Sequence, residues 1–205
     1  MRIAALLLLA SLPAVAQDRP PAYTPTRDVA VEYRLQSEGQ TQQMRIAWLA
    51  ARGLMRMEMP MGFAVMDQRS GQGFMAMTQQ RMVMDMAAGN LPAGSLTRPP
   101  ESARFTREGQ ERIAGQACTV WRMEDRGETA RSCITADGVM LRTTAGSGNR
   151  ATTIEATRVD YATQDPAQFN RPQGFQSLQL PPGMGTPPGG AFPQRGTALP
   201  PPGLR

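Results

Sequence analysis

The feature of this sequence that most constrains its fold is a stretch in which methionine occupies every second position. Residues 54–61 read LMRMEMPM, and arginine, glutamate and proline stand between the methionines. Successive side chains of a β-strand point to opposite faces of its sheet, so a period of two places all four methionines on one face. The stretch therefore predicts a half-buried β-strand with one apolar and one polar face.

The same alternation recurs in short segments along most of the chain. In DVAVEYRLQ (28–36), valine, tyrosine and leucine alternate with mostly polar residues, as in a half-buried antiparallel strand. Turn-forming residues, such as the SGQG at 70–73, separate several of the segments. Further strands are expected at residues 44–50, 54–59, 63–67, 74–77, 81–86, 103–109, 118–123, 129–135, 138–144 and 151–161. Short strands at a spacing of roughly ten residues predict an all-β fold with one antiparallel, curved, half-barrel-like sheet.

Composition divides the chain into four segments. Residues 1–16 combine a positive charge, an apolar stretch and small residues before a cleavage point, which predicts a signal peptide and an exported, periplasmic protein. The apolar stretch is too short to span a bilayer, so we expect no membrane-spanning segment. We expect an extended leader at 17–27, a single β domain at 28–179 and a disordered, proline- and glycine-rich tail at 180–205.

Two segments of the β domain break the strand pattern. Residues 87–103 are predicted to form a loop with room for one short helix, which would supply a lid. Residues 165–178 offer Phe169 and Phe175 as plugs for the apolar interior. The sequence is compatible with an open concave face and with one that this second segment closes.

The residue types that are missing exclude several chemistries. The chain has no histidine, and all 22 of its basic residues are arginine. It therefore lacks histidine-dependent triads, His-bearing zinc sites, and dyads or Schiff bases built on lysine. The arginines are scattered and the formal charge is only +5, so nucleic-acid binding is not expected. We expect neither enzymatic activity nor a cofactor.

Cys118 and Cys133 are the two cysteines of the chain, and export favours a disulfide between them. A four-residue loop at 124–127 would place Met123 opposite Glu128, and counting back then places Cys118 opposite Cys133. The Cα atoms of directly opposed residues lie within the roughly 4.4–6.8 Å that a disulfide bridges. The sequence therefore predicts a structural disulfide across this hairpin.

Three stretches resemble a known group of proteins: GQERIAGQACTVWRM (109–123), CITADGVMLR (133–142) and DPAQFNRPQGF (165–175). The matching residues are Gly109, Ile113, Gly115, Cys118, Trp121, Asp137, Gly138, Phe169, Pro172 and Gly174. On these residues the chain is similar to an uncharacterised family of exported bacterial β-proteins, which itself resembles the LolA/LolB-like lipoprotein carrier fold. The resemblance implies an open antiparallel half-barrel with an apolar concave side capped by short helices, and it brings no catalytic residues.

Ten of the 15 methionines lie between positions 55 and 86, and they admit several interpretations. They simply fill a β-sheet core, or they form a deformable wall for a lipid or acyl chain, because an unbranched thioether side chain adapts to irregular partners. They also suit Cu(I), which soft thioethers select, since residues i and i+2 of a strand are only about 6.6 Å apart. Thioether oxidation, as a scavenger of oxidants, is the remaining interpretation.

We predict a non-catalytic periplasmic protein that binds a hydrophobic envelope ligand, a lipid or acyl chain, on the concave face of its sheet. A periplasmic Cu(I)-binding protein is the alternative from a different class. The candidate wall residues are Met55, Met57, Met59, Met75, Met77, Met82, Met84 and Met86, flanked by Trp48 and Phe63.

Overall fold

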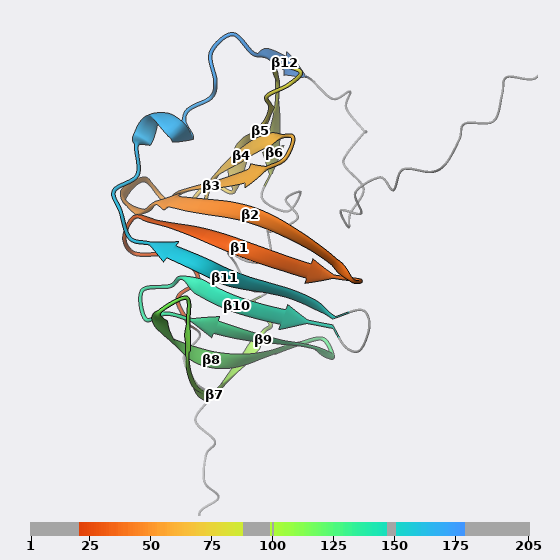
Figure 1. Cartoon of the computed structure of the whole chain (residues 1–205), viewed down its shortest axis with the longest axis vertical. Helices are drawn as coiled ribbons and strands as arrows, with labels where there is room; N and C mark the ends of the chain where they lie inside the picture. Colours follow the sequence, from red (N-terminus) through yellow and green to blue (C-terminus); the bar gives the residue numbers. More distant parts are fainter. Residues whose placement is uncertain (1–20, 88–98, 100, 147–150, 179–205) are drawn as a thin grey trace, which may run out of the picture.

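The structure is a computed structural model that describes residues 21–87, 99, 101–146 and 151–178. The predicted signal peptide, the predicted tail from residue 180 on and most of the predicted 87–103 loop lie outside the described residues. The described chain forms a 12-stranded sheet in the order β12-β6-β5-β4-β3-β2-β1-β11-β10-β9-β8-β7 (Figure 1). The strands are β1 (Val29–Ser37), β2 (Gln40–Leu49), β3 (Leu54–Met59), β4 (Gly62–Asp67), β5 (Gln72–Met77), β6 (Met82–Ala87), β7 (Arg104–Ile113), β8 (Gln116–Asp125), β9 (Glu128–Ile134), β10 (Met140–Ala145), β11 (Thr152–Asp160) and β12 (Gln176–Leu178).

The predicted fold class is confirmed, and every segment expected to be a strand from its alternation is one. The strands β1 to β6 form a meander of antiparallel hairpins, and β7 to β11 form a second one. Antiparallel pairing of β1 with β11 joins the two meanders, while β12 pairs in parallel with β6. In the part of the chain that the structure describes, two short 3-10 helices, η1 (Ala50–Arg52) and η5 (Pro166–Phe169), accompany the strands. The helices of the described chain are all too short to cross a bilayer.

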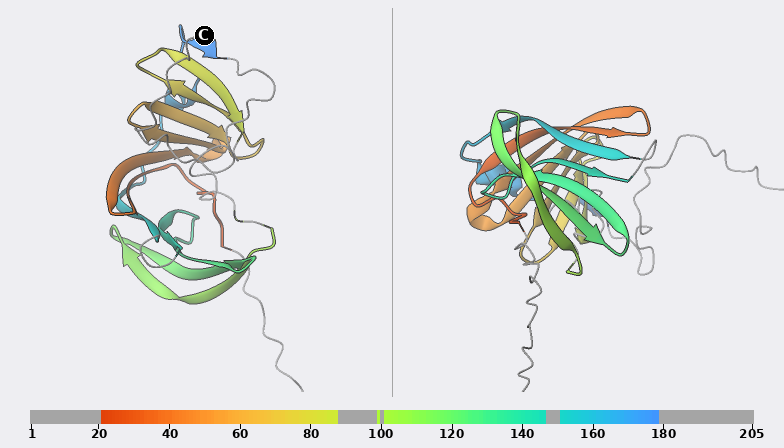
Figure 2. Two further views of the ribbon diagram at one scale, coloured as in Figure 1. Left: turned by 90° about the vertical axis from the view of Figure 1, so that its right-hand side faces the viewer. Right: turned by 90° about the horizontal axis from the view of Figure 1, so that it is seen from below.

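One face of the sheet, which we call the inner face, carries the main buried cluster. Its residues are Val29, Val31, Tyr33, Ile46, Trp48, Met55, Met57, Ala64, Met66, Ile113, Cys118, Val120, Cys133, Val139, Leu141 and Ala156. This single cluster joins strands from β4 to β7, which are far apart in the sheet order. The sheet is strongly curved along its strand order, and its two edge strands, β12 and β7, lie at opposite ends of the molecule (Figures 1 and 2).

The opposite, outer face is covered in part by the C-terminal segment of the described chain. The side chain of Phe169 is 3% exposed and packs with Ala30, Ala47, Leu49 and Val65 of the outer face. Arg56 binds the same segment by donating from Nη1 to the carbonyl oxygen of Gln168 at 2.7 Å. Phe169 is therefore packed as a plug, but on the outer face, and it does not cover the inner face. Phe175 stays partly exposed.

The described part of the leader, residues 21–27, packs at the other end of the sheet, near strands β7 to β10. The ring of Tyr23 lies 6.0 Å from that of Phe105, beside a small buried cluster formed by Phe105, Trp121, Ile134 and Met140. The amide of Thr26 donates to the carbonyl oxygen of Asp137 at 3.0 Å. This short piece is thus part of the packed domain.

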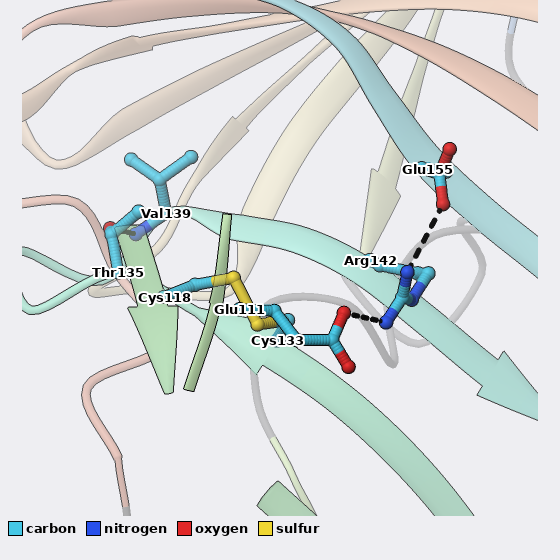
Figure 3. Close-up of a disulfide and its surroundings, with 7 residues drawn as sticks. All are labelled: Glu111, Cys118, Cys133, Thr135, Val139, Arg142 and Glu155. Atoms are coloured by element: carbon cyan, nitrogen blue, oxygen red, sulfur yellow. Dashed lines mark hydrogen bonds and ion pairs between the residues drawn. A yellow bond between two sulfur atoms is a disulfide. The ribbon is translucent and has the colours of Figure 1, made fainter. Parts of the chain in front are cut away.

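The disulfide between Cys118 and Cys133 is present, with a Cα–Cα distance of 5.4 Å (Figure 3). The predicted register of its hairpin is wrong by two residues. Asp125 lies opposite Glu128, so the turn has two residues instead of four, and Val120 is the residue opposite Cys133. The disulfide is therefore diagonal across the strands. A shift of two residues keeps both cysteines on the same face, which is why the bond forms despite the different register.

An arginine beside the disulfide is held by two carboxylates (Figure 3). Arg142 lies opposite Cys133 on β10, and its guanidinium forms ion pairs with Glu111 and Glu155. Glu111 in turn lies opposite Cys118 on β7, the exposed edge strand. The ion pairs and the disulfide thus connect strands β7 to β11 in one place.

Candidate functional site

The strand register brings the methionines of β3, β4, β5 and β6 into three rows on the inner face. From β3 to β6, the rows are Met55–Met66–Gly73–Met86, Met57–Ala64–Met75–Met84 and Met59–Gly62–Met77–Met82. All eight candidate methionines lie on this one face, as their alternation predicts. Met66 lies on the same face, and we call the nine methionines of the three rows the methionine wall. Each row combines three methionines with one small residue.

Two of the small residues let neighbouring strands approach closely. A Cβ atom on Gly62 would lie 1.9 Å from the carbonyl oxygen of Ala76, and one on Gly73 would lie 2.1 Å from that of Val65. Neither position accepts a side chain without movement of the backbone. Because Gly62 stands between Met59 and Met77 in its row, the surface is lower there than the thioethers on either side.

Burial decreases along the methionine wall toward the β12 edge. Met55 and Met66 are 1% exposed and Met57 is 3% exposed, so these three belong to the core. The five methionines of β5 and β6 are all partly exposed: Met75, Met77, Met82, Met84 and Met86. A sheet face that ends in exposed thioethers offers a soft apolar surface for a ligand.

An apolar groove of about 510 Å³ opens at one end of the wall, beside the tips of the β1–β2, β3–β4 and β5–β6 hairpins. Its apolar lining is Leu35, Met44, Met57, Met59, Pro60 and Met61, and its polar rim is Gln42, Gln43, Glu58 and Gln79. This volume falls within the range of small-ligand sites, roughly 300–1,000 Å³. Met61 is 46% exposed and is the large apolar side chain that projects most into solvent in the described chain.

The charge at the rim of this groove is already balanced. Glu58 accepts from Arg45 at 3.2 Å and from Arg56 at 3.3 Å, so its carboxylate is paired. The remaining rim groups are neutral amides of glutamine. No group of three or more His, Cys, Asp or Glu side chains that could hold a metal ion occurs among the described residues. The groove therefore favours an uncharged, apolar occupant.

The two predicted aromatic flankers have different positions. Trp48 lies on the inner face directly opposite Met55 and is 6% exposed, and its buried indole N–H has no hydrogen-bond partner among the described residues. Phe63 lies on the outer face, where it packs against Phe74 and beneath the guanidinium of Arg56. It is therefore not brought together with the methionine wall. In the segment FAVMD (63–67), the side chains of Ala64 and Met66 point to the inner face. Because side chains alternate along a strand, that of Phe63 points to the outer face.

Three inner-face residues that the candidate set omits also belong to the site. Met66 lies opposite Met55 in the wall, and Met44 and Leu35 line the groove. Alternation identifies all three, since Met66 follows Ala64 by two positions and Met44 precedes Ile46 by two. What alternation does not identify is the groove itself, which depends on how three hairpin tips meet.

Comparison with known proteins places the chain in a family. Residues 28–153 match the family described as Domain of unknown function (DUF4412). The chain belongs to this family. The expected membership of an uncharacterised β-protein family is thereby confirmed, and the match covers β1 to the start of β11. No curated protein sequence matches the chain significantly.

Solved structures of similar fold have very different sequences. An uncharacterized conserved protein from Thermus thermophilus is 12% identical with a TM-score of 0.54, covering 75% of this chain and 90% of that one. MucB in complex with MucA(peri) is 12% identical with a TM-score of 0.51, covering 77% of this chain and 59% of that one, so this chain spans less than two thirds of MucB. A putative outer membrane lipoprotein-sorting protein domain from Vibrio parahaemolyticus is 11% identical, covers 70% of this chain and 89% of that one, and has a TM-score of 0.31, which supports no conclusion.

Proposed function

We propose that this protein is a non-catalytic, periplasmic binding protein that holds the acyl chain of a lipid in the apolar groove and along the methionine wall. The observation that carries the proposal is the position of the groove. Its lining includes Met59, which stands in one row with the partly exposed thioethers of Met77 and Met82. An acyl chain in the groove would extend over Gly62, where the row is lowest, toward Met77 and Met82.

Three further observations support an apolar occupant. The rim carboxylate, Glu58, is paired with arginines, so the groove presents no free charge to a ligand. The C-terminal plug, Phe169, is packed on the outer face and leaves the inner face to a ligand. MucB, a protein of similar fold, forms a complex with MucA(peri), which agrees with a binding role for this curved sheet.

The two tryptophans provide a direct test with a brominated fatty acid, because bromine quenches indole fluorescence at short range. Trp48 lies on the inner face directly opposite Met55, whereas Trp121 belongs to a separate buried cluster with Phe105, Ile134 and Met140. In the Trp121→Phe variant, which retains Trp48, we expect saturable quenching by the brominated fatty acid. In the Trp48→Phe variant, which retains Trp121, we expect none. Equal quenching of both, or of neither, would refute binding at the wall.

A polar substitution in the groove tests the site itself. Met61→Gln changes an exposed side chain, so it should leave the fold intact while it weakens fatty-acid binding about fivefold, equivalent to roughly 1 kcal/mol of lost apolar contact. The matched control is Met123→Gln, a partly exposed methionine beside the separate cluster of Phe105 and Trp121. Binding that is weakened equally by both substitutions would place the ligand elsewhere.

A further inference from the structure

Four methionines of the β5–β6 hairpin form a compact quartet on the inner face. Met75 lies directly opposite Met84, and Met77 lies directly opposite Met82. The Cβ atoms of directly opposed residues are about 4.5–5.5 Å apart, and residues two apart along a strand are separated by about 6.6 Å. Four thioether side chains thus start from the corners of a small rectangle and project to the same side.

This arrangement occurs once among the described strands. Met55 and Met66 also oppose each other, but in the next row Met57 faces Ala64 and in the row after it Met59 faces Gly62. The pair on β3 and β4 is therefore isolated, whereas the two pairs on β5 and β6 are consecutive. Among the described strands, the β5–β6 hairpin is therefore the place where two methionine pairs face each other in consecutive rows.

The surroundings of the quartet leave room for the sulfurs to converge. On the β4 side, the neighbours of the quartet in its two rows are Ala64 and Gly62. The side chain of Ala64 is only a methyl group, and Gly62 has none. All four methionines are partly exposed, so an ion can reach them from solvent. The ion pair between Asp85 and Arg171 belongs to the outer face, because Asp85 alternates with Met84 and Met86.

The chemistry of four thioethers selects a soft monovalent metal ion. Thioether sulfur prefers Cu(I) over Zn²⁺, Mg²⁺ or Ca²⁺, which favour imidazole, thiolate or oxygen ligands. The chain contains no histidine, and both of its cysteines are in the disulfide. Methionine is then the soft metal ligand that this protein offers. We propose that Met75, Met77, Met82 and Met84 form a binding site for Cu(I).

Silver provides the cleanest first probe, because Ag(I) mimics Cu(I) and needs no reductant that would open the disulfide. We expect the intact protein to bind one Ag(I) ion in native mass spectrometry. X-ray absorption of the Cu(I) complex should show sulfur in the first coordination sphere, and that sulfur can only be thioether while the disulfide is intact. Coordination by oxygen and nitrogen alone would overturn the proposal.

A pair of double variants locates the site. Met77→Leu/Met82→Leu removes one side of the quartet but keeps apolar side chains of similar volume, and should weaken Cu(I) binding about tenfold or more in competition with a chromophoric chelator. Met55→Leu/Met66→Leu removes the isolated pair and should leave Cu(I) affinity unchanged. Equal effects of the two variants would refute the quartet as the site, with circular dichroism confirming that both fold.

The metal site and the acyl groove can be tested separately. The groove is lined by Met44, Met57, Met59 and Met61, none of which belongs to the quartet. Met61→Gln should weaken fatty-acid binding and leave Ag(I) binding intact. If the protein binds Ag(I) but not the brominated fatty acid, the metal site stands and the acyl-chain proposal fails, while the reverse result removes the metal site alone.

Discussion

The hydroxyl group of Tyr33 on β1 donates a 2.7 Å hydrogen bond to the backbone carbonyl oxygen of Met140 on β10, across the intervening strand β11. The bond is possible because the residue of β11 opposite Tyr33 is Ala156, whose methyl group leaves space for the ring. Tyr33 is 2% exposed, and burial raises the pKa of its phenol far above 10. This single bond connects the two meanders through the core of the inner face.

We expect Tyr33→Phe to lower the free energy of unfolding by about 1–2 kcal/mol, because it leaves the buried Met140 carbonyl without its donor. Urea denaturation at pH 7 measures the loss. The raised pKa adds a second signature. A buried phenol contributes stability that is complete below pH 10 and is lost as the pH rises above that value, because only the unfolded state ionises readily.

The difference in stability between the wild type and Tyr33→Phe should therefore shrink above pH 10. Tyr23, whose pKa burial raises to about 12, causes a loss between pH 10 and 12 that is common to both proteins. A difference that stays constant up to pH 12 would show that Tyr33 ionises as easily in the folded protein as in the unfolded chain.

Removing the disulfide should destabilise the fold, but the protein should still form its sheet. The cysteines are 15 residues apart, for which the chain-entropy estimate is about 3 kcal/mol. We expect the Cys118→Ala/Cys133→Ala variant to have a free energy of unfolding that is lower by this amount, as measured by urea denaturation. Treatment of the wild type with a phosphine reductant should reproduce the loss, and the same reductant should leave the variant unaffected. A reductant effect on the variant would assign the loss to another cause.

The sequence predicted the strands well because the direction of a side chain in a strand depends only on parity. Val29, Val31, Met55 and Met57 were assignable to one face without any knowledge of which strands pair. Register is different, since it depends on turn geometry. The β8–β9 turn has Arg126 at φ 48° and Gly127 at φ 86°, a two-residue turn with both residues left-handed, and arginine gives little signal for that conformation.

The site was predictable only in part for a related reason. Alternation identified eight wall methionines, and applied strictly to FAVMD it also adds Met66 and removes Phe63. The groove required more, because its lining comes from three hairpin tips that are brought together by strand pairing and sheet curvature. The quartet likewise depends on the β5–β6 register, which sets Met75 opposite Met84 and not opposite a polar residue.

Adding one methyl group at Gly62 should damage the sheet far more than adding one at Gly71. Both glycines have positive φ angles, +154° and +69°, so each alanine variant incurs backbone strain. Only at Gly62 would the new Cβ also collide with a backbone oxygen, that of Ala76. We expect a loss of about 3 kcal/mol for Gly62→Ala and about 1 kcal/mol for Gly71→Ala in thermal or urea unfolding. Equal losses would mean that strand β4 moves freely relative to β5.

Asp137 should confer a distinct acid dependence on stability, because it joins three segments of the chain. Its carboxylate accepts hydrogen bonds from Thr135 at 2.6 Å, from Arg27 of the leader at 2.8 Å and from Tyr161 after β11 at 3.1 Å. Burial alone would raise the pKa of Asp137, but these donors together outweigh it and lower the pKa below the ordinary 3.8. The ionised form is therefore the one that the folded state prefers.

A lowered pKa contributes stability that is present above pH 3.8 and is lost as the pH falls through the lower value of the folded protein. We expect Asp137→Asn to cost about 1–2 kcal/mol at pH 7, where the charged hydrogen bonds are lost, and progressively less below pH 4. The control is Asp67→Asn, since backbone amides of Arg69 and Ser70 lower the pKa of Asp67 as well, but that carboxylate is exposed and screened by solvent. Urea unfolding of the three proteins between pH 3 and 7 should show a convergence of Asp137→Asn with the wild type at low pH. Parallel curves across that range would show that Asp137 stabilises the fold by its position in the β9–β10 turn and not by its charge.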